Sequence, residues 1–394
     1  MIKTTKTTKT TKTTKKSTRK SAQTRKKTNS RRPWPVKTEL VGISLELVPV
    51  ENGYLYPQYT TGLHAWFLDL VRESDPKLSA LLHDDQMEKA FTISDLQGPL
   101  LPAGKGFQVS PDQTYRWYVT AMSSSVANWL ADWVRNLPEE LSLHGAPLSI
   151  RSWEIILPAT TYAQLLADTA ATGANVKLTF LTPTSFRQKK NHLPLPVPRN
   201  LFHSYLRRWN NFSREAFSQE EFLDWVEEHV VISHHKIESA KVAAGKRGMV
   251  TGFTGSVELN LSRSAGKNPD FQELFYALIE LAPYVGTGHK TTFGLGQTRI
   301  GWLEEEIVTT PAMQQMLAQR IAELTDIFLA QRQRIGTKRV QDTAQTWATI
   351  LARREWGESV TAIAEDIGMR YDTAKSYLKL ARRTLRQLGI AIRE

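Results

Sequence analysis

The chain has 394 residues, of which 41% are hydrophobic, and it carries a formal net charge of +12. This length allows two or three domains, each with a core of its own. Because the chain has no cysteine, disulfide bonds and thiolate-bound zinc are excluded. No apolar run approaches the roughly 18 residues of a membrane span, and the N-terminus has no apolar signal core. We therefore expect a cytoplasmic protein without a membrane partner.

Most of the excess positive charge lies at the N-terminus. Residues 1–32 hold 13 of the 51 Lys and Arg residues and no acid, so the other 38 are balanced by 39 acids. Residues 1–34 repeat Lys-Thr-Thr and contain almost no large apolar side chains, which predicts a disordered basic tail. This tail is either a polyelectrolyte arm that strengthens nucleic-acid binding or a dispensable solvated extension.

Residues 35–158 combine strand and helix patterns. Apolar residues alternate in the manner of a strand in some segments and recur at the spacing of one helix face in others. The predicted elements, in chain order, are Thr38–Val50, Thr61–Glu73, Phe91–Leu96, Tyr115–Met122, Ser124–Asn136 and Leu148–Leu157. Their types run strand, helix, strand, strand, helix, strand, which is the order of a ferredoxin-like unit.

Residues 159–305 repeat this order more loosely. Helices are predicted at Tyr162–Ala171, Phe202–Asn211, Glu220–Glu228 and Phe271–Leu281. Strands are predicted at Val176–Leu181, Val230–Val242, Met249–Leu261 and Phe293–Trp302. We therefore predict an α+β fold in which two ferredoxin-like (RRM-like) domains follow one another.

Residues 306–394 are predicted to be entirely helical. An apolar stripe from Val360 to Ile367 ends at Gly368, and a second helix begins near Tyr371. Helix, glycine turn and second helix are typical of a helix-turn-helix. The second helix presents an outer row of cations, namely Lys375, Lys379, Arg382 and Arg386. This row predicts either contact with DNA or the solvated face of a small helical bundle.

The segment Tyr284–Gln297 contains two Gly-x-Gly pairs around a basic, hydroxyl-rich centre. The glycines are Gly286, Gly288, Gly294 and Gly296, and the centre is His289, Lys290, Thr291 and Thr292. Glycine adopts positive φ and lets the backbone approach another chain closely, so the pattern predicts a loop whose N–H groups face a phosphate. The spacing matches neither the G-x-G-x-x-G motif nor the Gly-Lys-Ser/Thr motif. A phosphodiester backbone is therefore a better fit than a mononucleotide.

Two basic clusters interrupt the otherwise neutral body. Arg187, Lys189 and Lys190 form the first, and Lys246 and Arg247 lie in the turn of the predicted hairpin. Each cluster alone is typical of a solvated turn. Together they favour an RNA-binding groove.

Several segments, taken in order, resemble the CRISPR-associated repeat-processing endoribonuclease of the repeat-associated RNA-binding (RAMP) superfamily. They are Gly62–Val71, Leu82–Asp84, Phe91–Ser94, Thr182–Phe186, Pro194–Pro198, Leu206–Trp209 and the loop at Gly286–Gly296. The resemblance implies two tandem ferredoxin-like units, in agreement with the pattern above. The basic tail and the helical extension depart from the family.

The resemblance implies an endoribonuclease that needs neither metal nor cofactor. The 2′-hydroxyl of precursor CRISPR RNA attacks the adjacent phosphate and leaves a 2′,3′-cyclic phosphate and a 5′-hydroxyl. His64 lies where the family places its catalytic histidine, and Lys290 offsets charge on the phosphate. The alternative for His64 is a boundary histidine bonded to a backbone carbonyl.

The remaining candidates are weaker. His83 is expected to be structural and His289 to bind phosphate, while His234 and His235 lack the acidic partners of a metal site. Tyr59 is either a hydrogen-bond donor at the site or a packed aromatic residue.

Three functions stay open at this point. The first is a nuclease of antiviral defence that binds precursor and mature CRISPR RNA, with other effector subunits as further partners. The second is a repeat-binding subunit that does not cut. The third is a DNA-binding regulator that acts through the helix-turn-helix.

Overall fold

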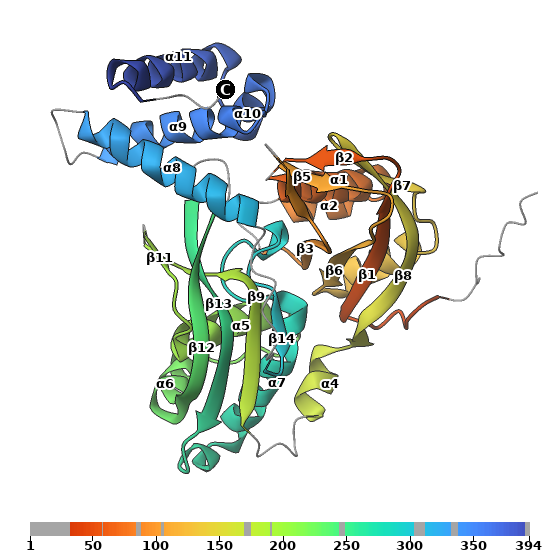
Figure 1. Ribbon diagram of the computed structural model, residues 1–394. Coiled ribbons are helices and arrows are strands. Elements are labelled where there is room, and N and C mark those ends of the chain that lie inside the picture. Colours follow the sequence, from red (N-terminus) through yellow and green to blue (C-terminus); the bar gives the residue numbers. More distant parts are fainter. Residues whose placement is uncertain are drawn as a thin grey trace, which may run out of the picture.

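The computed structural model describes residues 32–56, 58–83, 88–103, 106–168, 175–189, 191–243, 249–302, 312–331 and 338–390. It contains two α/β units and a helical domain that lies against both (Figure 1). Nearly all of the predicted tail at residues 1–34 lies outside these ranges, as do Lys190, Lys246 and Arg247.

The first unit is built on an antiparallel sheet with the strand order β3-β6-β1-β8-β7. Its strands are β1 (Leu40–Pro49), β3 (Phe91–Gln97), β6 (Tyr115–Ala121), β7 (Glu140–Leu143) and β8 (Ala146–Thr160). Its helices are α1 (Tyr59–Ser74), α2 (Pro76–His83) and α3 (Ser124–Trp133). A small second sheet comprises β2 (Gly53–Leu55), β4 (Leu101–Ala103) and β5 (Gly106–Val109). Without the added β7, the order is that of a ferredoxin-like unit, which confirms the prediction.

The orientation of α1 is set by its apolar stripe. Leu63, Phe67 and Val71 are fully buried against the sheet. The ring of Phe67 lies 4.7 Å from that of Phe91 and 5.4 Å from that of Trp129, measured between centroids. Aromatic contacts of this kind stabilise a core beyond the burial of their area. The packed stripe therefore fixes the direction in which the side chain of His64, the residue after Leu63, projects from the helix.

The second unit has the same topology. Its sheet has the order β12-β13-β9-β14, formed by β9 (Val176–Thr184), β12 (Val230–Ala243), β13 (Met249–Leu261) and β14 (Thr298–Ile300). Its helices are α4 (Tyr162–Ala167), α5 (Pro198–Phe212), α6 (Gln219–His229) and α7 (Pro269–Val285). A hairpin of β10 (Phe186–Gln188) and β11 (Asn191–Leu193) projects from it, and a 3₁₀ turn, η1, covers Ala265–Lys267. The prediction of a second ferredoxin-like unit is confirmed.

The predicted strand at Phe293–Trp302 is wrong over its first half. Only Thr298–Ile300 pair with β9 as β14. The preceding residues Thr291–Phe293 form a 3₁₀ turn, η2, and Gly294 and Gly296 have φ of 82° and 70°. Positive φ lies outside the β region, so the chain turns here instead of extending.

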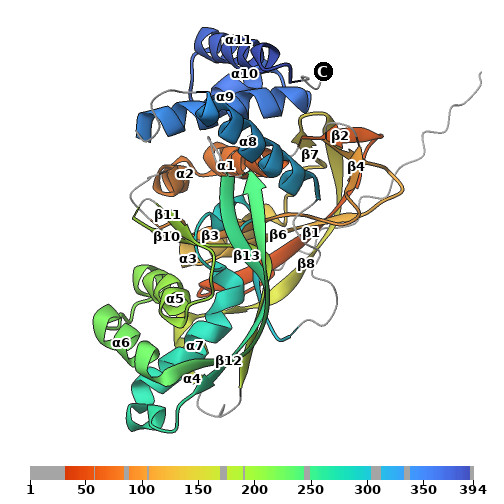
Figure 2. The same ribbon diagram turned by 60° about the vertical axis from the view of Figure 1, so that its left-hand side comes forward.

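The helical domain comprises α8 (Ala312–Ala330), α9 (Lys338–Glu355), α10 (Val360–Asp366) and α11 (Tyr371–Gln387). Helix α8 packs against β12 and β13, and α11 lies on the side away from both α/β units (Figure 2). The predicted helix-turn-helix is confirmed as α10, a turn at Gly368 with φ of 62°, and α11. Each described helix is too short or too polar to cross a membrane.

Buried ion pairs join the helices of this domain. Arg320 of α8 contacts Glu355 of α9, with 2.9 Å between Nε and Oε2. Arg353 of α9 contacts Asp366 of α10 at 2.7 Å and also pairs with Glu358. Removing one partner of a buried pair leaves an uncompensated charge, so these contacts hold the helices in register.

Candidate active site

His64 lies where the two α/β units meet. Its Nδ1 is 2.9 Å from the carbonyl oxygen of Thr292, which belongs to the second unit. Its ring stacks on Phe293 with 4.2 Å between centroids and an interplanar angle of 22°. The glycine loop, more than 200 residues further along the chain, is thus in direct contact with the predicted catalytic histidine.

The contact with Thr292 determines the tautomer of His64. A carbonyl oxygen only accepts, so Nδ1 carries the proton and donates it. In the neutral ring the lone pair then lies on Nε2. The structure therefore confirms that His64 is bonded to a backbone carbonyl, and the catalytic role of its second nitrogen stays a prediction.

The surroundings of His64 favour this neutral form. Burial lowers the pKa of His64, the hydrogen bond to Thr292 partly opposes the shift, and the charges of His83 and Lys89 lower it further. A neutral imidazole can accept a proton at physiological pH. The group is accordingly suited to act as a general base.

Steric contacts explain the glycines of the loop. All four, Gly286, Gly288, Gly294 and Gly296, have positive φ. A Cβ on Gly296 would lie 2.0 Å from the carbonyl oxygen of Thr287, and one on Gly288 would lie 2.4 Å from that of Ser185. Both neighbours are backbone atoms that cannot rotate away. Glycine is therefore required for the loop to fold back on itself.

The expectation that the loop amides face a phosphate is wrong for at least seven of them. Those of Thr287, Phe293 and Gln297 donate to Gly296 O, Lys290 O and Thr182 Oγ1. The N–H groups of Gly286, Gly288, His289 and Gly296 donate within the protein, to Ala282 O, Ser204 Oγ, Ser185 O and Pro183 O. The loop is mostly buried, and buried N–H groups need protein acceptors. The glycines therefore shape the loop, and these amides are not available to a ligand.

The side chains at the tip of the loop lie within a basic patch. His289 and Lys290 are half-buried, whereas Thr291 is buried. The rings of His289 and His192 are 5.3 Å apart, and His192 lies opposite Arg187 in the β10–β11 hairpin. Burial, followed by the charges of Lys290, His192, Arg187 and Arg207, lowers the pKa of His289 to about 4. We call Arg187, His192, Arg207, His289 and Lys290 the loop patch.

The electrostatics of the loop patch suit an anion. Burial also lowers the pKa of Lys290, because its ammonium group is partly removed from water. The Nδ1 atoms of His192 and His289 are buried without a hydrogen-bond partner among the described residues. Mutual repulsion of cations is relieved when a phosphate lies between them. Of the predicted first cluster, Arg187 belongs to the patch, and Lys189 lies in the adjoining turn with φ of 52°.

Sequence reasoning missed Arg208, the residue that holds the loop in place. It is buried on α5, and its Nη2 donates to the carbonyl of Gly288 at 2.9 Å. Its Nη1 donates to Ser204 Oγ at 2.6 Å, and its Nε lies 3.7 Å from Glu88. The spacing of Ser204 and Arg208, four residues apart on one helix face, was the available signal. His192 was missed as well. It lies opposite Arg187 in the β10–β11 hairpin, and a prediction of that hairpin would have brought the two residues together.

Other predicted residues have structural roles. The hydroxyl of Tyr59 accepts from the Leu96 N–H at 3.2 Å, and its ring packs edge-on against Phe107 in the core. His83 donates from Nδ1 to the carbonyl of Ser79 at 2.8 Å, as expected. His234 stacks on Trp302. Across the described ranges, no three His, Asp or Glu side chains are grouped as metal ligands.

The helical domain borders the site. A cavity of about 190 Å³ lies between the start of α1, including Tyr59 and Gly62, and the residues Arg353 and Asp366. The carboxylate of Asp366 partly offsets the lowering of the Lys290 pKa. The extension therefore lies beside the face on which His64 and the loop meet.

Comparisons with known proteins agree with this geometry. The family model for the CRISPR Cas6 N-terminal domain matches residues 41–135, and that for the CRISPR-associated endoribonuclease Cas6 matches residues 178–298. Neither match extends into the helical domain. A comparison with curated proteins gave no match.

Solved structures show the same fold. A Cas6 product complex is 26% identical, with a TM-score of 0.54, and covers 66% of this chain and 100% of its own. A second Cas6 product complex is 24% identical, with a TM-score of 0.52 and coverage of 66% and 99%. Cas6 from Thermus thermophilus is 24% identical, with a TM-score of 0.51 and coverage of 67% and 99%. This chain belongs to the Cas6 family of CRISPR-associated endoribonucleases.

Proposed function

We propose that the protein binds precursor CRISPR RNA and cleaves it within the repeats without a metal ion, with His64 as the catalytic residue. The observation that carries the proposal is the hydrogen bond from His64 Nδ1 to Thr292 O. With the proton on Nδ1, the lone pair of the neutral ring lies on Nε2, and the histidine that carries it contacts the glycine loop. The RNA-cleaving relatives in the family make RNA the substrate to test.

The chemistry follows from the groups present. His64 Nε2 removes the proton of a ribose 2′-hydroxyl, and the 2′-oxygen attacks the adjacent phosphorus. The bond from phosphorus to the 5′-oxygen breaks, and that oxygen leaves with a proton as a 5′-hydroxyl. The phosphate remains as a 2′,3′-cyclic ester. Lys290, two residues before Thr292, offsets the negative charge that builds up on the phosphate.

The loop patch holds the RNA backbone in this proposal. Arg187, His192, Arg207, His289 and Lys290 surround the tip of a loop whose shape depends on its glycines. We also assign Lys246 and Arg247, which lie outside the described residues, to RNA binding. We assign residues 35–158 and 159–305 to the two units that form the site, and residues 306–394 to the helical domain.

An alternative within the same family is a subunit that retains repeat RNA without cutting it and docks on other effector subunits. In that protein, the contact of His64 with the Thr292 carbonyl would serve only to join the two α/β units. The two functions differ in their products, because only the nuclease generates new RNA ends.

Incubation of a repeat-containing transcript with the protein in EDTA separates them. We expect a single cut in each repeat, with a 2′,3′-cyclic phosphate on the upstream product, identified by its resistance to phosphatase until acid opens the cyclic ester to a monoester. Intact RNA that stays bound to the protein would favour the non-cutting subunit. Cleavage only after magnesium is supplied would contradict the metal-independent mechanism.

A further inference from the structure

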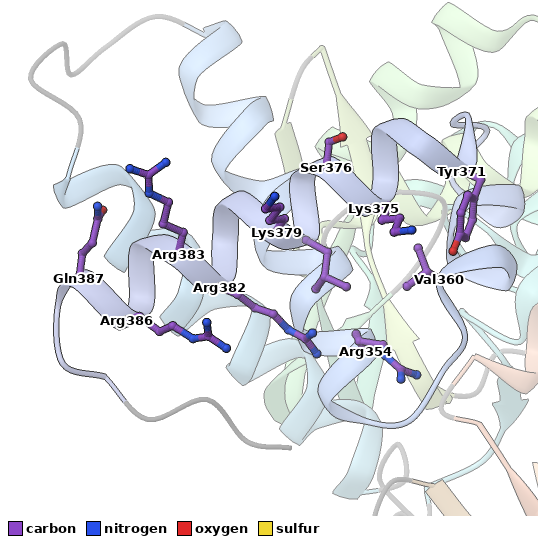
Figure 3. Close-up of a pocket in the computed structure, with 11 residues that line it drawn as sticks. Arg354, Val360, Tyr371, Lys375, Ser376, Lys379, Arg382, Arg383, Arg386 and Gln387 are labelled. Carbon is purple, nitrogen blue, oxygen red and sulfur yellow. The ribbon is translucent and has the colours of Figure 1, made fainter.

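The outer face of α11 carries an unbalanced positive charge. Five cations lie along this 17-residue helix, and its one acid is Asp372 near the start. The cations are Lys375, Lys379, Arg382, Arg383 and Arg386. Together with Arg354 of α9 they line a groove of about 990 Å³, and no carboxylate of the described residues contributes to its wall (Figure 3). We call this surface the α11 groove.

Packing of the domain does not account for these cations. The internal cations Arg320 and Arg353 are each paired with acids. By contrast, none of the five cations of α11 forms an ion pair with any described residue. The Nε of Arg382 is buried and has no hydrogen-bond partner within the described part of the chain. A buried guanidinium nitrogen without an acceptor is costly, so no contact within the described part of the chain compensates for the placement of Arg382 in the groove.

The opposite face of α11 already has its packing partners. Ala374, Leu378, Ala381 and Leu385 are buried inside the helical domain. The cations recur at the same helical spacing on the other side, and Tyr371 and Leu380 are exposed beside them. Figure 3 shows Arg382 and Arg386 on the flank that faces Arg354, and Arg383 and Ser376 on the other flank. Polar and charged side chains are thus presented along the whole exposed helix.

We propose that the α11 groove binds duplex DNA, with α11 in the major groove. At 1.5 Å per residue, α11 is about 25 Å long, and it lies on the outer side of the molecule (Figure 1). The turn at Gly368 places it as the second helix of a helix-turn-helix, the element that enters the major groove of B-form DNA. The major groove of A-form RNA is too deep and narrow for side chains to read. The helix geometry therefore selects DNA over duplex RNA.

This site is separate from the proposed nuclease. His64 and the loop patch lie on α1, the glycine loop, α5 and the β10–β11 hairpin, whereas α11 lies on the side of the helical domain away from both α/β units. A single chain would then cut CRISPR RNA at one site and hold DNA at another. Failure of either activity leaves the other intact.

The test uses the full-length protein and a fluorescent duplex DNA of mixed sequence. The variant Lys379→Glu/Arg386→Glu reverses two exposed cations of the groove. The control Arg263→Glu/Lys267→Glu reverses two exposed cations of the second unit and changes the net charge equally. We expect at least a tenfold weaker affinity for the groove variant alone, and a salt dependence reduced by about two phosphate contacts. Repeat RNA cleavage should be unchanged in both variants.

Three outcomes would overturn the proposal. The wild type does not bind duplex DNA, the two variants lose affinity equally, or a duplex RNA of the same sequence binds the groove as tightly as the DNA. Equal losses would assign the binding to overall charge. Unchanged RNA cleavage in the groove variant shows that it is folded, so the result on DNA is interpretable.

Discussion

Replacing His64 with alanine is expected to slow cleavage of repeat RNA by about 10²–10⁴-fold, the usual contribution of a general base. RNA affinity should stay close to that of the wild type, because the loop patch remains. Rates under single-turnover conditions and affinities from filter binding would be measured on the same preparations. His234→Ala serves as a control, since His234 stacks on Trp302 and makes none of the contacts of His64.

Alanine also removes the hydrogen bond to Thr292 and the stacking on Phe293. The variant His64→Asn separates position from chemistry, because its amide can still donate to the carbonyl but cannot accept a proton at neutral pH. Equal loss in both variants supports a base. Substantial recovery with asparagine would show that the histidine only positions the loop.

The pH dependence has a defined sign. Because burial lowers the pKa of His64, the neutral base persists below the ordinary value of 6.5. The cleavage rate of the wild type should therefore be flat near neutrality and fall as the pH drops through the lowered pKa. A rate that instead falls as the pH rises through this range would show that the imidazolium acts as an acid.

The second large effect is expected from Gly296→Ala. The added Cβ would lie 2.0 Å from the backbone oxygen of Thr287, and the residue would have to keep a φ of 70°. The Thr287 N–H to Gly296 O bond of 2.7 Å would be strained as well. We expect a loss of about 3 kcal/mol or more in stability, together with at least tenfold weaker RNA binding.

Gly301→Ala is the matched control. Gly301 also has positive φ, at 106°, but an added Cβ would meet no atom within 4 Å. Gly301→Ala should lose stability through backbone strain alone, because no atom clashes with the added Cβ, and the glycine loop stays intact. If thermal unfolding and RNA affinity change equally in the two variants, the tight fold of the loop is not what RNA binding requires.

The sequence predicts most of the fold because apolar periodicity is a local signal. The alternation in Thr38–Val50 and the helical stripe in Thr61–Glu73 correspond to β1 and α1 within a few residues. The second unit is recognised for the same reason. The strand predicted at Phe293–Trp302 fails because its apolar residues pack in a turn that only the glycines reveal.

The candidate site depends on long-range contacts, which periodicity does not contain. The catalytic assignment of His64 came from a family resemblance, and its proximity to Thr292 is visible only in the folded chain. The amides were predicted to face phosphate because their acceptors, Pro183, Ser185 and Ser204, lie on other elements. Arg208 was overlooked because its spacing from Ser204 indicates a contact within α5, whereas its contact with the carbonyl of Gly288 is long-range.

The most direct test of the account uses a repeat RNA with one 2′-deoxy nucleotide immediately upstream of the cleaved phosphate, incubated with wild-type protein in EDTA. The account predicts that this RNA binds as tightly as the all-ribose RNA and is not cut, while the all-ribose RNA is cut at that phosphate. Cleavage of the deoxy-substituted RNA at the same position would show that the attacking group is not the 2′-hydroxyl, and would contradict the account.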